Sequence, residues 1–224
     1  MPLALVALVA VTLWPGRLQS DEKSAALPVV VCLGDSITKS GYPQELGKML
    51  PIRVINAGVG GNTSRQGLAR IEKDVLSHKP DAVVVFFGTN DNRHDAPKVF
   101  VPLPEYEDNL TKIIDACRGV NAKVILGTLP PIDPGPYFKR HKKADFDAAG
   151  GLEKLVAQYR DAASKVGKTK KVPVVDLNTL LAKDTSWRNP DGVHPTEEGN
   201  KVIAKQFVAS VAKELGVNPT TNTP

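Results

Sequence analysis

The chain has 224 residues, of which 42% are hydrophobic and 24% are charged, as in an ordinary globular protein. This length is sufficient for one domain with a sizeable core. The net charge is +5, but Lys and Arg are mixed with Asp and Glu along most of the chain. The dense basic cluster at residues 139–143 shows no alternation of aromatic and basic residues and no nucleic-acid motif, so we interpret it as a solvated loop. These totals exclude nucleic acid as an expected partner.

The first residues form an apolar segment that differs from the rest of the chain. Leu3–Trp14 is uninterrupted apart from Thr12. The segment is shorter than a comfortable membrane span and is typical of a secretory signal. We therefore expect residues 1–26 to be a leader and the protein to be exported, with no stable membrane span in the mature chain. No Lys or Arg precedes the segment, which leaves a retained N-terminal anchor as the alternative.

Five short apolar runs rich in β-branched residues recur through the sequence, and their nearly continuous apolar character favours strands that are covered on both faces. The runs are Pro28–Leu33, Ile52–Asn56, Ala82–Phe87, Lys123–Gly127 and Val172–Leu177. Helical periodicity lies between them, for example at Leu68, Ile71 and Val75. This alternation predicts an α/β fold, a three-layer α/β/α sandwich with a five-stranded, mostly parallel sheet. We expect one domain over residues 27–217, followed by a frayed polar tail over residues 218–224.

Residues with catalytic chemistry follow several of these predicted strands. Ser36 comes after the first run, residues 58–62 after the second and residues 88–91 after the third. Asp191 and His194 precede the last predicted helix. Because ligands of open parallel sheets bind outside the carboxyl ends of the strands, we expect these segments to meet at one edge of the sheet.

Ser36, Asp191 and His194 have the chemistry of a nucleophilic catalytic set. A serine hydroxyl needs a base to take its proton and a carboxylate to orient that base. The Gly-Asp-Ser tripeptide that ends at Ser36 is by itself more typical of a turn or helix cap. The segment from Asp191 to His194 is more specific, because its spacing lets the carboxylate reach one ring nitrogen while the other faces the serine. We expect Pro195 to start the last helix and hold His194 at its entrance.

Two further segments can donate hydrogen bonds to a developing oxyanion. Residues 56–63 form a Gly-rich turn whose backbone N–H groups can point at a ligand. The turn lacks both the P-loop ending and the glycine spacing of a dinucleotide-binding fingerprint, which favours an oxyanion donor over a phosphate cradle. A tight turn without function is the alternative. Asn90 can donate through its side-chain amide, or it can simply form a turn.

The other histidines and the two cysteines have no predicted catalytic role. His78, His94 and His141 lack a partner at a suitable offset, and we assign them to solvent or to capping. Cys32 and Cys117 are interpreted as two buried thiols, although oxidation to a disulfide stays open for an exported protein. No pair of His or Cys has metal-ligand spacing, so we expect no metal and no cofactor.

Taken in order, these motifs resemble those of the GDSL esterases, also called SGNH hydrolases, over roughly residues 29–207. The resemblance identifies Ser36 as the nucleophile, His194 as the base and Asp191 as the partner that orients it. The first motif reads Gly-Asp-Ser-Ile, so Ile37 stands where the family name has Leu, and this swap keeps the apolar contact.

The same resemblance assigns the oxyanion hole. Gly61 and Asn90 match the family's two donors beside the N–H of Ser36, and Gly58 is a less favoured candidate for the glycine. The family further implies a flavodoxin-like three-layer fold and a metal-free mechanism.

The function expected from these residues is that of a serine esterase that works through an acyl-enzyme. We expect a lysophospholipase- or arylesterase-like activity, and a carbohydrate O-deacetylase is the alternative. The partner is then a small-molecule, lipid or carbohydrate ester. A non-catalytic binding domain on the same fold is less favoured, because every member of the catalytic set is present. The Pro/Gly-rich stretch 130–151, with Tyr137, Phe138 and the basic cluster, is predicted to be a long loop that either lines an acyl or anionic-headgroup site or is simply solvated.

Overall fold

One sheet of five parallel strands organises the chain. In a computed structural model, residues 26–220 are described. Nearly all of the expected leader and the last residues of the expected tail therefore lie outside the described residues. The strands are β1 (Val29–Gly34), β2 (Arg53–Gly58), β3 (Ala82–Phe86), β4 (Lys123–Gly127) and β5 (Val174–Val175). They lie in the order β2-β1-β3-β4-β5, and each neighbouring pair is parallel.

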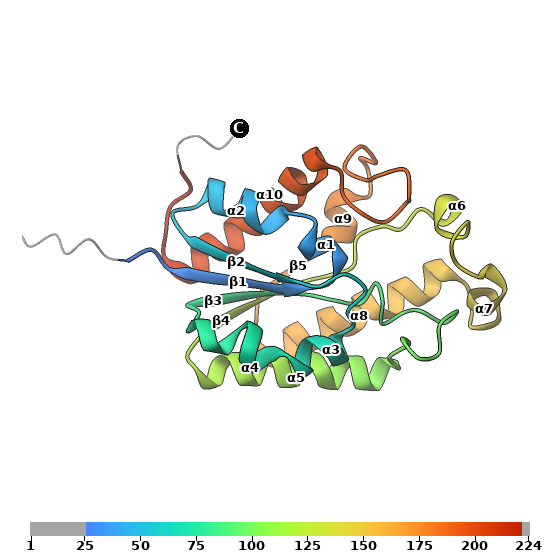
Figure 1. Ribbon diagram of the computed structural model, residues 1–224, viewed down its shortest axis with the longest axis horizontal. Helices are drawn as coiled ribbons and strands as arrows, with labels where there is room; N and C mark the ends of the chain where they lie inside the picture. The colour runs from blue at the N-terminus through green and yellow to red at the C-terminus, as the bar shows by residue number, and fades with distance from the viewer. Residues whose placement is uncertain (1–25, 221–224) are drawn as a thin grey trace, which may run out of the picture.

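Helices cover both faces of this sheet (Figure 1). On one face α2 (Tyr42–Met49) packs against α10 (Glu197–Leu215), and on the other α5 (Leu103–Gly119) packs against α8 (Leu152–Lys170) and α3 (Ser64–Ala69). The remaining helices are α1 (Ser36–Lys39), α4 (Ile71–Asp74), η1 (Leu76–His78), α6 (Pro134–Tyr137), α7 (Lys143–Ala148) and α9 (Leu177–Leu181). The three-layer sandwich is confirmed, and its strand order is that of the flavodoxin-like fold.

The core explains why the strand runs are apolar without alternation. Residues 30–33 of β1 are fully buried, and all of β3 is buried. Both side-chain faces of a strand must be apolar when helices cover both faces of the sheet. Cys32 on β1 and Cys117 on α5 are buried, free thiols in this core, which confirms their interpretation.

Two predicted elements are interrupted by polar side chains. The fifth run forms a strand only at β5, because the Asp176 side chain accepts hydrogen bonds from the backbone N–H groups of Asn178 and Thr179 and so begins α9. The stripe through Leu68 and Ile71 is split between α3 and α4 at Arg70. The Arg70 guanidinium turns toward the sheet, where it donates to the carbonyl of Gly34.

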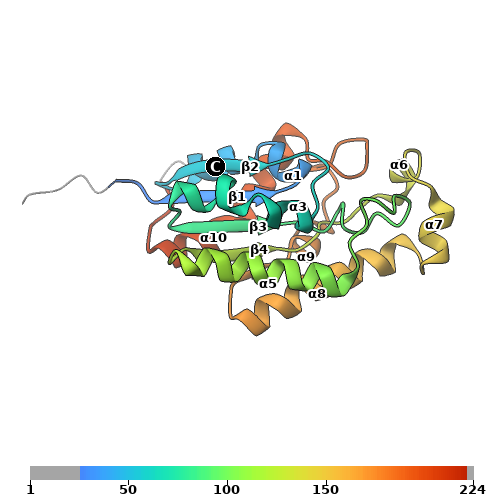
Figure 2. The same cartoon turned by 60° about the horizontal axis from the view of Figure 1, so that its bottom comes forward.

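The predicted long loop at residues 130–151 contains two short helices, α6 and α7, which lie beyond the carboxyl ends of the strands (Figure 2). Asp133 caps α6 by accepting from the N–H of Gly135. The Tyr137 and Phe146 rings are buried and in edge-to-face contact, with their centroids 5.6 Å apart. His94 packs on Phe146, so aromatic contacts fix residues 130–151, the insertion between β4 and α8, to the segment that follows β3.

The two ends of the described chain lie at the opposite edge of the sheet from this insertion (Figure 1). Thr220 in the expected tail donates from its N–H to the Met49 carbonyl and from its hydroxyl to the Lys48 carbonyl, at the end of α2. Of the helices formed by residues 26–220, none combines the length and apolar character needed to cross a bilayer.

The strand order creates a crevice between β1 and β3. The chain builds outward to β2 on one side of β1, then returns to β3 on the other side and continues to β4 and β5. The carboxyl ends of β1 and β3 lie side by side, with Gly34 in register with Phe86. Loops that leave these two ends diverge to opposite faces of the sheet, which opens a binding crevice at this point.

Gly58 generates a prediction about stability, because the backbone of α1 passes directly over it. A Cβ atom at Gly58 would lie 2.2 Å from the Lys39 nitrogen and 2.7 Å from the Thr38 carbonyl carbon. We expect Gly58→Ala to lower the free energy of unfolding by about 2 kcal/mol, measured by urea denaturation. Gly60→Ala is the matched control, since a Cβ there has no atom within 4 Å, and it should change stability by less than about 0.5 kcal/mol. Equal stability of the two variants would contradict this close packing.

Candidate active site

Ser36 lies at the carboxyl end of β1, in the first turn of α1. The Asp35 carboxylate caps this helix by accepting from the Ile37 N–H at 2.9 Å. The chain packs so closely here that a side chain at position 34 would not fit, since a Cβ on Gly34 would lie 2.7 Å from the Phe86 carbonyl oxygen. Neighbouring backbone atoms therefore fix the position of Ser36 at the crevice between β1 and β3.

Asp191 and His194 are held in one turn of the loop between α9 and α10. One carboxylate oxygen of Asp191 accepts from the backbone N–H groups of Val193 and His194, both at 2.9 Å. The other oxygen lies 2.5 Å from His194 Nδ1. The opposite ring nitrogen, Nε2, lies 2.8 Å from the hydroxyl oxygen of Ser36. The structure thus brings the three predicted residues into one hydrogen-bonded chain.

Pro195 does not start the last helix, contrary to the sequence prediction. Helix α10 begins at Glu197, and Thr196 is its N-cap, with its hydroxyl accepting from the Gly199 N–H at 2.9 Å. Pro195 instead forms an isolated antiparallel bridge with Arg188. Thr196 is the N-cap because its hydroxyl accepts a hydrogen bond from a backbone N–H that would otherwise lack a partner. His194 is consequently positioned by its own loop rather than by the helix entrance.

The two predicted oxyanion segments line the same cavity as Ser36. Gly61 has a φ of 77°, a backbone conformation that favours glycine, and it borders the cavity together with Asn90. The Asn90 side-chain amide donates to the Asn62 carbonyl at 3.0 Å. The same amide nitrogen also lies 3.5 Å from a carboxylate oxygen of Asp35, at the limit of a hydrogen bond, so a ligand oxygen would replace only this weak contact. The N–H of Gly58 already donates to the Asn56 side chain at 2.9 Å, which makes it the weaker candidate.

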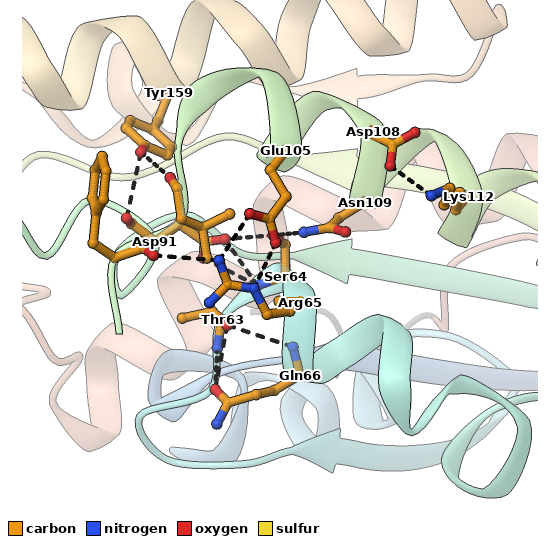
Figure 3. Close-up of polar contacts among 12 residues, drawn as sticks. Thr63, Ser64, Arg65, Gln66, Asp91, Glu105, Asp108, Asn109, Lys112 and Tyr159 are labelled. Atoms are coloured by element: carbon orange, nitrogen blue, oxygen red, sulfur yellow. Dashed lines mark hydrogen bonds and ion pairs between the residues drawn. The ribbon is translucent and has the colours of Figure 1, made fainter. Parts of the chain in front are cut away.

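A buried polar network fixes these two segments to each other (Figure 3). The Asp91 carboxylate accepts from the Ser64 N–H at 3.0 Å and from the Ser64 hydroxyl at 2.5 Å. Asn109 on α5 donates to the same hydroxyl at 3.0 Å. The network joins the start of α3, just after Gly61, to the segment after β3 that carries Asn90. Both predicted donors therefore rest on a rigid, internally satisfied base.

Three carboxylates near the site have shifted pKa values, in different directions. Burial raises the pKa of Asp35 to about 7, and the neighbouring Asp91 charge adds to the shift. Burial also raises the pKa of Asp91 to about 6, against hydrogen bonds from Ser64. Partial burial would raise the pKa of Asp191, but hydrogen bonds from His194 and Val193 outweigh it and keep the pKa below its usual value. Asp191 is therefore ionised at neutral pH, as an orienting carboxylate must be.

The cavity at Ser36 has a volume of about 220 Å³. Its lining combines the predicted residues with others that sequence reasoning did not single out. It is formed by Ser36, Gly61, Thr89, Asn90, Arg93, Tyr137, Arg140, His141, Val193 and His194. The insertion contributes Tyr137, Arg140 and His141, so it does border the site. In the sequence, the basic cluster at residues 139–143 was consistent with a stretch that borders an anionic-headgroup site. A run of charges does not, however, reveal which of its members face inward.

His141 is not a solvent or capping residue, and this prediction was wrong. Its Nδ1 lies 3.0 Å from a carboxylate oxygen of Asp95, and its ring stacks on Tyr137 with centroids 4.0 Å apart. Arg93 holds the same carboxylate from the other side through two of its nitrogens. Asp95 lies 46 positions before His141, and Tyr137, four positions before it, forms no recognisable motif with it. Only the fold therefore identifies these residues as partners.

Comparison with known proteins agrees with this geometry. Residues 32–202 match the model of the GDSL-like Lipase/Acylhydrolase family. The chain belongs to this family. As a GDSL-like acylhydrolase, it is a carboxylic ester hydrolase, and a purely non-catalytic domain is not what the family predicts.

Similar proteins come from several sources. The chain is 33% identical to the uncharacterized lipoprotein YqeF of Bacillus subtilis, over 78% of this chain and 85% of that protein. It is 33% identical to the isoamyl acetate-hydrolyzing esterase 1 homolog of Mus musculus, over 86% and 84%. It is 28% identical to an acetylxylan esterase of Geobacillus stearothermophilus, over 77% and 76%. A crystal structure of a catalytic mutant of an acetylxylan esterase from that organism matches the fold with a TM-score of 0.67, at 23% identity over 83% of this chain and 94% of that one.

The raised pKa of Asp35 generates a prediction about pH. The folded protein holds a proton on Asp35 up to about pH 7, whereas the unfolded chain releases it near pH 4, so folding loses stability as the pH rises through this window. Asp35→Asn keeps the capping oxygen and does not titrate. We expect its free energy of unfolding, relative to the wild type, to increase by more than about 1 kcal/mol between pH 4 and pH 8. A difference that stays constant across urea titrations at both pH values would contradict this.

Proposed function

We propose that the GDSL-like hydrolase uses Ser36 as nucleophile, His194 as general base and acid, and Asp191 as the orienting carboxylate. The observation that carries this proposal is the chain of contacts from Asp191 through His194 to Ser36, at 2.5 Å and 2.8 Å. Nucleophile, base and orienting group within hydrogen-bond reach of one another are the geometric signature of an activated serine. The backbone bonds to Asp191 hold the carboxylate in place, which in turn fixes which imidazole nitrogen faces the serine.

The oxyanion hole that we propose consists of the N–H groups of Ser36 and Gly61 and the side-chain amide of Asn90. All three residues line the cavity in which an ester carbonyl would lie. One N–H of Asn90 would exchange its long contact with Asp35, at 3.5 Å, for the developing charge, while the other stays bound to Asn62. Fixed donors of this kind stabilise the transition state without reorganisation during the reaction.

The reaction then proceeds in two steps. His194 takes the proton of the Ser36 hydroxyl as its oxygen attacks the ester carbonyl carbon, and the carbonyl oxygen becomes the oxyanion. His194 returns the proton to the leaving alcohol oxygen, the carbon–oxygen bond breaks, and an acyl-enzyme remains on Ser36. Water repeats the sequence: His194 takes its proton, the resulting hydroxide attacks the acyl carbon, and Ser36 recovers its proton as the acid leaves.

Short acyl esters, acetyl esters above all, are the substrates that we propose. The cavity at Ser36, about 220 Å³, lies below the usual range for pockets that enclose a drug-sized ligand, and its walls carry several polar side chains. Two of the relatives are named for the hydrolysis of isoamyl acetate and of acetylxylan. Carbohydrate O-deacetylation is thus a second candidate supported by a specific relative. A lysophospholipase would need an apolar groove. The cavity of about 290 Å³ that is partly lined by Ile132, Leu152 and Val156 shares no lining residue with that of Ser36.

We also propose that the protein is exported, with a leader over residues 1–26, a hydrolase domain over 27–217 and a polar tail over 218–224. The apolar segment near the start of the chain supports a leader. The relative named as a lipoprotein supports a location outside the cytoplasm. Amino-terminal sequencing of the protein recovered from its producing cells tests the leader. An intact Met1 on all of the protein would reject a cleaved leader.

Ser36→Ala tests the nucleophile. The variant retains the fold, because only one oxygen is removed, but it has no group to attack the ester. We expect turnover of p-nitrophenyl acetate to fall by at least about 10⁴-fold, with an unchanged urea midpoint. Ser77→Ala is the control, since its hydroxyl bonds to the Lys73 carbonyl away from the site, and it should retain activity. A fluorophosphonate should label Ser36 in the wild type, and labelling at another residue would reject the assignment.

Acyl chain length tests the substrate class. We expect kcat/KM to be at least about tenfold higher for p-nitrophenyl acetate than for p-nitrophenyl octanoate, because the small cavity cannot enclose and desolvate a long chain. Rates measured across chains of two to twelve carbons would define the limit. An optimum at eight carbons or more would favour the lysophospholipase-like function instead.

A further inference from the structure

The basic cluster at residues 139–143 divides into two parts in the folded protein. Lys142 and Lys143 lie on the surface and pair with Asp145 and Asp147, one turn further along α7. Arg140 instead borders the cavity that holds Ser36. A solvated charge run would have all of its members in water, so the position of Arg140 calls for a separate explanation.

Arg140 has hydrogen-bonding capacity to spare at this position. One terminal nitrogen donates to the Asp191 carbonyl at 2.8 Å and lies 3.9 Å from the Asp191 carboxylate. Its other nitrogens have no partner within residues 26–220, and 45% of the side chain is exposed. Arg93, the other guanidinium in the wall, is committed to Asp95 through two of its nitrogens. The Arg140 side chain is also the more exposed of the two, 45% against 25% for Arg93, so it is the guanidinium more open to a ligand in the cavity.

No acidic side chain in the described part of the protein lines this cavity to neutralise that cation. Three carboxylates contact residues of the wall without lining the cavity, and each already has a partner. Asp35 is fully buried and accepts from the Ile37 N–H. Asp95 is only 7% exposed and is held by Arg93 and His141. Asp191 is bound by His194. An anion that entered the cavity would meet a guanidinium fork, whose geometry suits a carboxylate or a phosphate, without competition from a free acid.

The place of Arg140 indicates which part of the substrate carries the anion. In the proposed mechanism, on which this inference rests, His194 gives its proton to the leaving alcohol, so the alcohol lies on the His194 side of the cavity. Arg140 is bound to the loop that carries His194. We propose that Arg140 is a specificity-determining residue that binds a carboxylate or phosphate on the alcohol portion of the ester.

Aryl acetates that carry a charged or a neutral group in the para position test this proposal, because differences in size and leaving-group acidity cancel when each variant is compared with the wild type. The substrates are 4-acetoxybenzoate, 4-acetoxyphenyl phosphate and the neutral methyl 4-acetoxybenzoate, assayed with the purified full chain. We expect Arg140→Gln to lower the ratio of anionic to neutral kcat/KM by about tenfold, mainly through KM, because a hydrogen bond to a charged group is lost. Both substrate types are expected to lose a common factor from displacement of the Asp191 loop, and the ratio removes it. A fall confined to one anion identifies carboxylate or phosphate as the recognised group.

Lys142→Gln is the matched control, since it removes the same charge from the same segment without touching the cavity. Its ratio should stay within roughly twofold of the wild type, because a solvent-exposed charge is screened. An unchanged ratio in Arg140→Gln, or an equal fall in Lys142→Gln, would overturn the proposal. Inhibition by 4-hydroxybenzoate against its methyl ester gives a second, non-catalytic measure of the same preference. Hydrolysis of all three esters by Ser36→Ala would instead reject the proposed nucleophile, so the two failures are distinguishable.

Discussion

The contact between His194 and Ser36 joins residues that are 158 positions apart, and the proposed mechanism depends on it. Neither partner is free to adjust. Gly34 lets the chain turn so closely that Ser36 is fixed against the end of β3. On the other side, a Cβ on Gly199 would lie 1.8 Å from the Trp187 carbonyl oxygen, so the His194 loop packs directly on the first turn of α10. The absence of side chains at two glycines thus helps to set the distance between the His194 ring and the Ser36 hydroxyl.

The buried carboxylates of Asp35 and Asp91 are the electrostatic consequence of building this site at the edge of a packed sheet. Each is fully buried, and burial raises the pKa of each. Their hydrogen bonds are structural: Asp35 caps α1, and Asp91 joins the start of α3 to the segment after β3 (Figure 3). Such groups cost folding free energy when ionised, but Asp35 holds the start of α1 and Asp91 holds the segments of Gly61 and Asn90 together.

The insertion between β4 and α8 contributes to the site in two ways. Its aromatic side chains pack against the segment after β3, and the Asp133 N–H donates to the Gly192 carbonyl at 2.9 Å. Gly192 has a φ of 82°, and a Cβ there would lie 2.8 Å from the Asp133 carbonyl oxygen. The insertion therefore supports the turn that carries Asp191 and His194 as well as forming part of the cavity wall. A single segment thus couples the position of His194 to the shape of the cavity at Ser36.

Local patterns in the sequence were sufficient to determine the fold class, the strand positions and the four segments that meet at the crevice. Apolar runs of strand length define the sheet because both its faces are buried, and the spacing of Asp191 and His194 lies within one turn. Contacts between distant segments were decided only by the tertiary structure. Arg140 and His141 face the cavity while Lys142 faces solvent, and Thr196 rather than Pro195 caps α10. These outcomes depend on which buried polar atoms still need a hydrogen-bond partner in the folded protein. That in turn depends on neighbours far along the chain.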